Sequence, residues 1–415
     1  MEPQRPAPSR DRRCRRPGRS DAIVRTIFAS TYPPRHCGIA TFTQALSSAT
    51  GEREIVALHA PGPNLMYPAE VHHRIRRDEP GDYVRTARDL TRCADVVSVQ
   101  HEYGIWGGDD GAAVLDFVRA LDAPAVATLH TVLRHPTPNQ RAVLLELIRM
   151  ASATVVMSRS AAHVLAGTYG VPADKVDVIP HGVPNLPLVP AETVKPALDL
   201  AGREVILSFG LLGHGKGFEL VIDALPAIVA ARPTACYVIL GATHPNLLAT
   251  EGEAYRRSLE EHVARLGMGR HVRFVDRFVG RVELTRWLEG ADVFVTPYPN
   301  LDQIVSGTLS YAMGAGRAIV STPYAYASEL LDGGRGILVP PGSPAAWADA
   351  LIGLLENDEL RAAVGRRAHE HSRSMVWSNV ATQYRQLFAR VVADARIQTG
   401  TRIAARPLPF VAARG

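Results

Sequence analysis

Short apolar runs alternate with amphipathic segments along most of this chain. The runs predict buried strands, and the segments, whose apolar positions recur every three to four residues, predict helices. Because strand and helix alternate, we expect a parallel sheet with helices on both faces. In the first half the strands are expected at Ala22–Ala29, Glu54–His59, Val71–Arg76, Asp95–Gln100, Ala125–Leu129, Thr154–Met157 and Val176–Ile179, and the helices at Ile39–Ala49, Tyr83–Cys93, Gly111–Leu121, Pro138–Met150 and Arg159–Thr168.

The pattern breaks once and then resumes. Prolines 184, 187, 190 and 196 lie in a segment without apolar periodicity, which predicts a linker over 184–196. Beyond it we expect strands at Val205–Phe209, Cys236–Leu240, Val272–Val275, Val293–Thr296, Ala318–Ser321 and Gly336–Val339, and helices at Phe218–Ala231, Ala254–Leu266, Val282–Glu289, 308–313, Ala325–Leu331, Pro344–Glu356, Asp358–His371 and Trp377–Ala393.

Two doubly wound α/β domains of similar size follow from this order, one over 21–183 and one over 197–375. We expect them to face each other across a cleft, because ligands of open parallel sheets bind beyond the carboxyl ends of the strands. A length of 415 residues also favours two hydrophobic cores over one.

Positive charge is concentrated at the two ends. Residues 1–20 carry seven Arg against two acids, and residues 396–415 carry four Arg and no acid, while the whole chain is only +5. We expect both tails to be disordered; they are candidates for peripheral contact with an anionic membrane at its inner face. The body has no basic stripe with aromatic residues, which argues against nucleic acid.

Other features restrict the compartment. No apolar run reaches the roughly 18–20 residues that a membrane-spanning helix needs, and the Arg-rich start does not resemble a signal peptide. The four cysteines contain no C-x-x-C pair, which argues against a zinc site. We therefore expect a cytoplasmic protein.

Candidate anion-binding groups lie in two loops of the second domain. Ser306, Gly307 and Thr308 stand where a short helix is expected to begin, and free N–H groups at such a point attract an anion. After the first strand of this domain, Gly213 allows close approach of the backbone and Lys216 supplies a positive charge. An ordinary Ser-capped helix is the alternative interpretation of the first feature.

Polar and aromatic residues gather at strand ends of the first domain. Gly38 follows two prolines after the first strand, where a phosphate or sugar loop and a simple turn both fit. His101, Glu102 and Trp106 follow the fourth strand and have the chemistry of a sugar site, although no second histidine completes a zinc motif. His130 follows the fifth strand and is either a donor to a substrate hydroxyl or a structural histidine.

With these residues in place, residues 22–395 resemble the retaining GT-B glycosyltransferases of family 4 (group 1). The motifs that carry the resemblance are the Pro-rich Gly loop at 33–38, Thr128-Leu-His130, Ile179-Pro-His-Gly-Val183, Phe209-Gly-x5-Lys216-Gly, Ala291-Asp-Val-Phe-Val-Thr-Pro297, Ala312-Met-x-x-Gly316 and Gly336-Ile-Leu-Val-Pro-Pro-Gly342. In this family the last helix, here 376–395, crosses back onto the first domain.

The resemblance implies a hexosyltransferase that needs neither metal nor cofactor and uses a GDP-, UDP- or ADP-hexose donor and a saccharide or lipid-linked acceptor. The leaving phosphate would accept the proton of the acceptor. His130, Lys216 and Gln303 would act in catalysis; Gly38, Leu212, Gly213, Lys216, Asp302, Ser306, Gly307, Thr308, Tyr311 and Glu329 would bind the donor; His101, Glu102 and Trp106 would bind the acceptor.

This chain departs from the family at three positions. The family's Arg before the Lys is replaced by Leu211, and its two Glu residues, eight apart, are replaced by Gln303 and Tyr311. Gln303 can still hydrogen-bond a sugar, and Asp302 is a candidate for the lost carboxylate. Two alternative functions follow from these departures: a phosphorylase or sugar-1-phosphate-dependent transferase on the same fold, and a non-catalytic carbohydrate- or nucleotide-binding partner.

Overall fold

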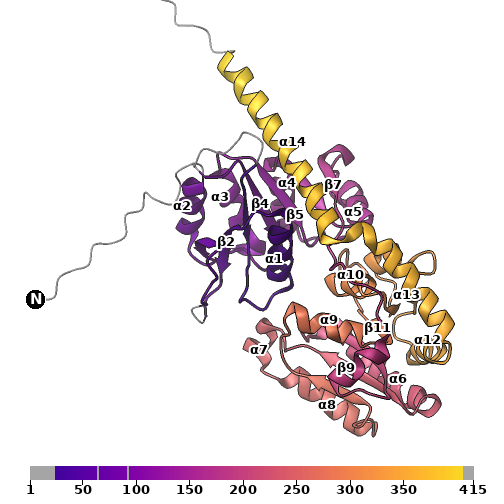
Figure 1. Ribbon diagram of the computed structural model, residues 1–415. Coiled ribbons are helices and arrows are strands. Elements are labelled where there is room, and N and C mark those ends of the chain that lie inside the picture. The colour runs from indigo at the N-terminus through magenta and orange to yellow at the C-terminus, as the bar shows by residue number, and fades with distance from the viewer. Residues whose placement is uncertain (1–23, 63–64, 91–92, 405–415) are drawn as a thin grey trace, which may run out of the picture.

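A computed structural model describes residues 24–62, 65–90 and 93–404, which form two parallel sheets in separate lobes (Figure 1). The first sheet has the order β3-β2-β1-β4-β5-β6-β7 and the second the order β10-β9-β8-β11-β12-β13. Within the described residues the strands are β1 Thr26–Ser30, β2 Glu54–His59, β3 Val71–Arg76, β4 Val96–His101, β5 Ala125–Leu129, β6 Ala153–Val156, β7 Val176–Val178, β8 Glu204–Phe209, β9 Ala235–Leu240, β10 Val272–Val275, β11 Val293–Thr296, β12 Ala318–Ser321 and β13 Ile337–Leu338.

Helices connect these strands and cover both faces of each sheet. They are α1 Gly38–Thr50, α2 Pro80–Leu90, α3 Ala113–Arg119, α4 Pro138–Met150, α5 Arg159–Tyr169, α6 Phe218–Ala231, α7 Pro245–Glu251, α8 Ala254–Arg265, α9 Arg281–Glu289, α10 Gly307–Gly314, α11 Ala325–Leu331, α12 Pro344–Glu356, α13 Asp358–Ser372 and α14 Trp377–Ala404. The predicted α/β architecture with two parallel sheets is confirmed.

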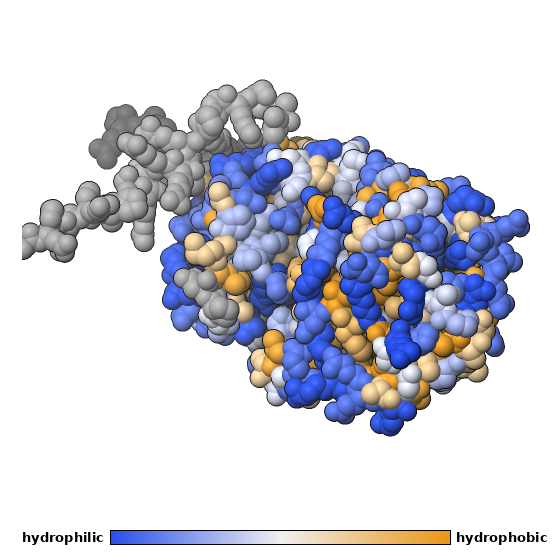
Figure 2. All heavy atoms as spheres, turned by 60° about the horizontal axis from the view of Figure 1, so that its bottom comes forward, coloured by the Kyte–Doolittle hydropathy of each residue, from blue (hydrophilic) through white to orange (hydrophobic). Residues whose placement is uncertain are grey.

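The central strands are buried on both sides, as their apolar sequences predicted. Every residue of β1, β4, β5 and β9 is buried, and separate apolar clusters lie on the two faces of each sheet. The face turned forward in Figure 2 carries mostly polar side chains with apolar ones between them. Each lobe therefore has its own core and holds its strand ends in a fixed geometry.

The last helix joins the two lobes. Val183 pairs with Val376 just before α14 begins, and α14 then runs along the first lobe against α1 (Figure 1). The Tyr384 hydroxyl lies 3.1 Å from the Thr128 hydroxyl of β5, and Phe388 packs edge-on against Phe28 of β1. The chain thus crosses between the lobes at two adjacent points, near 183 and near 376.

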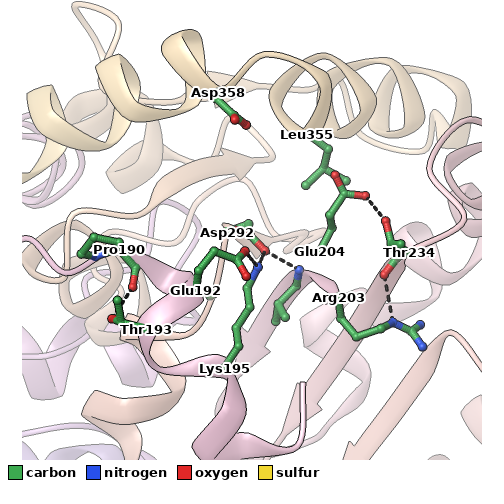
Figure 3. A network of polar contacts seen from close by, with 12 residues as sticks. Pro190, Glu192, Thr193, Lys195, Arg203, Glu204, Thr234, Asp292, Leu355 and Asp358 are labelled. Carbon is green, nitrogen blue, oxygen red and sulfur yellow. Dashed lines mark hydrogen bonds and ion pairs between the residues drawn. The ribbon is translucent and has the colours of Figure 1, made fainter. Parts of the chain in front are cut away.

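Residues 190–198 are anchored to the second lobe, although the prolines predicted a plain linker. Lys195 is 1 % exposed, and its ammonium lies 2.7 Å from the Asp292 carboxylate and also pairs with Glu192 (Figure 3). Asp292 in turn accepts a hydrogen bond of 2.6 Å from the Val205 N–H of β8. A buried ion pair therefore fixes this segment beside the second sheet.

Several boundaries differ from the prediction. β4 includes His101, one residue beyond the predicted end, and α14 continues to Ala404, so the expected disordered tail from 396 is wrong for its first residues. Helix α7 was not predicted, although His244 and Pro245 are an N-cap and a first-turn proline. Residues 1–20 and 405–415, where most of the tail arginines lie, are outside the described residues.

Candidate active site

The loop after β8 brings Lys216 to the carboxyl edge of the second sheet. Gly217 has φ 65°, a backbone conformation that favours glycine, and a Cβ there would overlap the carbonyl oxygen of Pro297. This close approach sets the Lys216 ammonium over the Tyr298 ring, 4.4 Å from its centroid. Tyr298 belongs to the loop after β11, so two neighbouring strand ends meet here.

The start of α10 lies at the other end of Tyr298. Its hydroxyl is 2.7 Å from the Thr308 hydroxyl, which is itself 3.0 Å from the Ser306 hydroxyl. Ser306 caps the helix by accepting from the Leu309 N–H. Among the described residues, the N–H groups of Gly307 and Thr308 have no acceptor. Lys216 and the open helix start therefore come together, as the sequence predicted.

A pocket of about 470 Å³ opens beside this loop. It lies between the Gly-rich loop and the start of α7, and its lining residues are Leu211, Gly213, Gly215, Lys216, His244, Asn246, Leu247 and Thr250. Leu212 was expected to bind the donor, but its side chain is fully buried in the core and the neighbouring Leu211 lines the pocket instead. The contribution of α7 was missed because this helix was not recognised.

His181 links the two lobes at the helix start. A Cβ on Gly307 would lie 2.9 Å from His181 Nε2, so the His181 ring packs directly on the first residue of α10. The ring also lies beside those of Phe42, Tyr311 and Trp377. Tyr311 is thus placed next to the crossing between the lobes. His181 belongs to the motif Ile179-Pro-His-Gly-Val183, but the sequence alone assigned it no role.

His130 lies in a buried polar cluster at the end of β5. It is 8 % exposed, its Nε2 is 2.9 Å from Gln100 Oε1, and the Phe42 ring packs edge-on against it. Burial, with the neighbouring His181 and His101, lowers the pKa of His130 to about 3. Its ring is therefore neutral near pH 7 and can exchange hydrogen bonds with a neutral hydroxyl.

For two residues, His101 and Trp106, the predicted role in acceptor binding is wrong because both side chains are buried. His101 is fully buried because β4 extends over it and pairs it with Leu129 of β5. Trp106 is 2 % exposed, packs against Tyr83 and Phe117, and donates its indole N–H to the Gln100 carbonyl oxygen. Neither side chain is available to a sugar.

The third predicted acceptor residue, Glu102, is half-buried. Its carboxylate accepts hydrogen bonds from the Thr131 hydroxyl and the Tyr103 N–H, and burial raises its pKa. The predicted Gly38 is the first residue of α1, and open space surrounds the position of a Cβ there. Both residues remain candidates for substrate contact in the first domain.

Glu329 joins the two domains and does not face the pocket. Its carboxylate accepts from the N–H groups of Arg159 and Ser160 at 2.9 and 2.8 Å, and from the Ser160 hydroxyl at 2.7 Å. It thereby caps the start of α5, where the helix dipole favours an anion. These contacts engage the carboxylate with the first domain in this structure, and the role of Glu329 in donor binding stays a prediction.

The loop before α10 also contacts the first domain. Asp302 forms an ion pair of 3.1 Å with Arg134, and the Ile304 carbonyl oxygen accepts from the Ser158 hydroxyl at 2.8 Å. Gln303 donates one side-chain amide hydrogen to the Val305 carbonyl oxygen, which leaves its second amide hydrogen and its amide oxygen for a ligand. Asp302 is thus engaged with the first domain.

The buried histidines predict a pH-dependent stability. Burial lowers the pKa of His101 and of His181 to about 4 each. Because an unfolded histidine titrates near 6.5, the unfolded chain binds protons first as the pH falls. We expect stability to be highest above about pH 6.5 and to decrease toward pH 4, by up to about 1.4 kcal/mol per pH unit for each histidine.

Urea unfolding at pH 7, 6 and 5 measures how steeply the free energy of unfolding changes with pH. His101→Leu should reduce this pH dependence by the contribution of about one proton, roughly 1.4 kcal/mol per pH unit. His72→Leu, at an exposed position of β3, should leave the pH dependence unchanged. Equal slopes in wild type and His101→Leu would contradict the prediction.

Within the described part of the chain, no group of three or more His, Cys, Asp or Glu side chains is arranged to hold a metal ion. None of the helices formed by the described residues combines the length and the hydrophobicity that spanning a bilayer requires.

Comparison with known proteins assigns both halves of the chain to family models. Residues 38–185 match the model "Glycosyltransferase Family 4", and residues 203–357 match "Glycosyl transferases group 1". A D-inositol 3-phosphate glycosyltransferase of Corynebacterium glutamicum is 30% identical over 205 residues, 48% of this chain and 46% of the relative. A phosphatidyl-myo-inositol mannosyltransferase of Mycolicibacterium smegmatis is 29% identical over 278 residues, 66% of this chain and 67% of the relative. The chain thus spans about half the length of the first of these relatives.

Solved structures show the same arrangement of domains. Anabaena HepE in complex with UDP-glucose superposes with a TM-score of 0.70 at 16% identity, covering 89% of this chain and 99% of that protein. Sucrose-phosphate synthase from Thermosynechococcus elongatus gives 0.70 at 17% identity, covering 89% and 100%. These likenesses show the two-domain GT-B fold. With the family models on both halves, the chain belongs to the family 4 (group 1) glycosyltransferases.

Proposed function

We propose that this protein is a retaining glycosyltransferase that moves a hexose from a nucleotide-sugar to a saccharide or lipid-linked acceptor. The observation that carries the proposal is the convergence of Lys216, the Thr308 hydroxyl and the free N–H groups of Gly307 and Thr308 around Tyr298. This set of donors suits a phosphoryl group at the edge of the second sheet.

The chemistry follows from where negative charge develops. When the bond to the anomeric carbon breaks, charge accumulates on the leaving diphosphate, and fixed donors stabilise it in the transition state. The phosphate oxygen then accepts the proton of the attacking hydroxyl on the same face of the sugar. The neutral ring of His130 would contact the donor sugar from the first domain, and the Gln303 amide oxygen would accept from one of its hydroxyls.

The names of similar proteins support this class of substrate. HepE is described in complexes with UDP and with UDP-glucose, and the inositol relatives are named as a glycosyltransferase and a mannosyltransferase. We propose accordingly that the donor is a nucleoside diphosphate hexose.

A thermal-shift screen tests this proposal. Uridine, guanosine and adenosine diphosphates, their hexose derivatives and inorganic phosphate are added to the full chain. A ligand at 100 times its Kd stabilises a protein by about 2.7 kcal/mol, which raises the Tm of a domain of this size by roughly 5–10 °C. We expect one nucleotide series to do so. If inorganic phosphate alone stabilises, a phosphorylase is favoured; if no ligand does, the donor assignment fails.

A further inference from the structure

The loop between β1 and α1 reaches across the gap to the second domain. The His36 ring stacks on the Phe278 ring of the loop after β10, with centroids 4.4 Å apart and planes inclined by 4°. Gly38 begins α1 two residues later. Because Arg35 directly precedes His36, this cross-domain stack holds the backbone of Arg35 close to the second domain.

The Arg35 side chain has no partner among the described residues. It forms no ion pair and no side-chain hydrogen bond there, although its Nη1 atom is buried. A buried donor without an acceptor is costly unless a ligand or water satisfies it. The positive charge of Arg35 nevertheless acts on His244 of the second domain, whose pKa is lowered by burial, by Lys216 and by Arg35.

The pocket beside Lys216 therefore holds positive charge without a compensating anion. His244 and Lys216 both line it, and Lys216 lies over the Tyr298 ring with no carboxylate partner within the described part of the chain. Three acids of the neighbouring segments have partners: Glu251 contacts His214, and Glu253 and Asp276 pair with the buried Arg256. Lys216 in the pocket lining and Arg35 in the facing loop, neither of which has a carboxylate partner among the described residues, together favour a multiply charged anion.

We propose that Arg35 is a donor-binding residue, which the first domain contributes to the diphosphate held in the pocket of the second domain. The inference rests on the proposed function and deepens it. A guanidinium can hold two phosphate oxygens at once, which Lys216 cannot do, and Leu211 adds no charge to the pocket lining. Binding of the diphosphate would then add a second contact between the β1–α1 loop and the second domain, beside the stack of His36 on Phe278.

Calorimetric titration of the full chain with uridine, guanosine and adenosine diphosphates, and with the corresponding nucleosides, tests the role of Arg35. Arg35→Met should weaken binding of the preferred diphosphate by about 10- to 100-fold, the value of a charge-assisted contact, and leave nucleoside binding unchanged. Arg35→Lys should recover part of the loss. Arg88→Met, at an exposed arginine of α2, is the matched control and should bind as wild type.

A second readout needs no ligand. If Arg35 lies at the pocket, removing its charge raises the pKa of His244 in an NMR titration, as Lys216→Met also should. If Arg35→Met leaves the pKa of His244 unchanged and binds the diphosphate within twofold of wild type, the proposed role of Arg35 is overturned, while the proposed function of the protein is not. The proposed role is also overturned if Arg35→Met binds the diphosphate as wild type but has a raised KM for the acceptor, because Arg35 would then contact the acceptor. A wild-type chain that binds none of the diphosphates would overturn the proposed function itself.

Discussion

Lys216→Met is expected to reduce sugar transfer by about 10²–10³-fold, the loss seen when one fixed donor to a developing anion is removed. The ammonium stands at the edge of the second sheet, over Tyr298 and next to the open start of α10. Without it, the charge that develops on the leaving phosphate loses its cation in this domain. The measurement is turnover of the nucleotide-sugar identified by the ligand screen, including its slow hydrolysis.

The matched control is Lys175→Met, because Lys175 is exposed and lies before β7, far along the chain from the pocket. It should leave turnover and diphosphate affinity unchanged. Lys216→Met should keep the wild-type Tm in the absence of ligand, since Lys216 forms no ion pair within the described residues. A Lys216→Met protein that is folded and turns over as wild type would contradict the assignment of the phosphate site.

Lys195→Met is expected to destabilise the protein by about 3 kcal/mol, because it leaves the Asp292 carboxylate buried without its partner. Lys195 and Asp292 are 1 and 7 % exposed in their side chains, and their charged atoms lie 2.7 Å apart (Figure 3). The measurement is urea unfolding followed by far-UV circular dichroism, with Lys175→Met as the control for loss of an exposed lysine.

A double variant separates the ion pair from simple packing. Lys195→Met with Asp292→Asn removes the buried carboxylate together with the buried ammonium, and the Asn oxygen can still accept from the Val205 N–H. We therefore expect it to recover more than half of the stability that Lys195→Met loses. If the losses of stability in Lys195→Met and in Asp292→Asn simply add in the double variant, the ion pair is not the source of the effect. Because both residues lie away from the pocket, ligand affinity should be unchanged.

Sequence patterns were sufficient for the architecture. Apolar runs such as Val96–Val99 are typical of strands buried on both sides in a covered parallel sheet. The strand and helix pattern resumes after the prolines, which indicated a second core. Lys216, Ser306 and Thr308 were also predicted as neighbours from residue type and position relative to strands. The close approach at Gly217 and the hydroxyl of Tyr298 then bring them together.

Sequence reasoning failed where the depth of a side chain decided its role. His101 and Trp106 have the chemistry of a sugar site, but one additional residue in β4 and the packing of Trp106 against Phe117 place both inside the first lobe. The contact of the Glu329 carboxylate with α5 of the other domain was likewise not predicted. These outcomes depend on how separate segments pack, from 11 residues apart for Trp106 and Phe117 to 170 for Glu329 and Arg159.

The amino-acid sequence by itself determined the two parallel sheets, the helices around them and the loops at which chemistry is concentrated, because hydrophobic periodicity and turn residues act locally. Only the tertiary structure decided which side chains reach those loops. His36 and His181 of the first domain contact the second, and Lys195 lies buried in a segment rich in proline. Their positions follow from how the two lobes pack and from which charges remain unpaired between them, and neither property can be derived from local sequence.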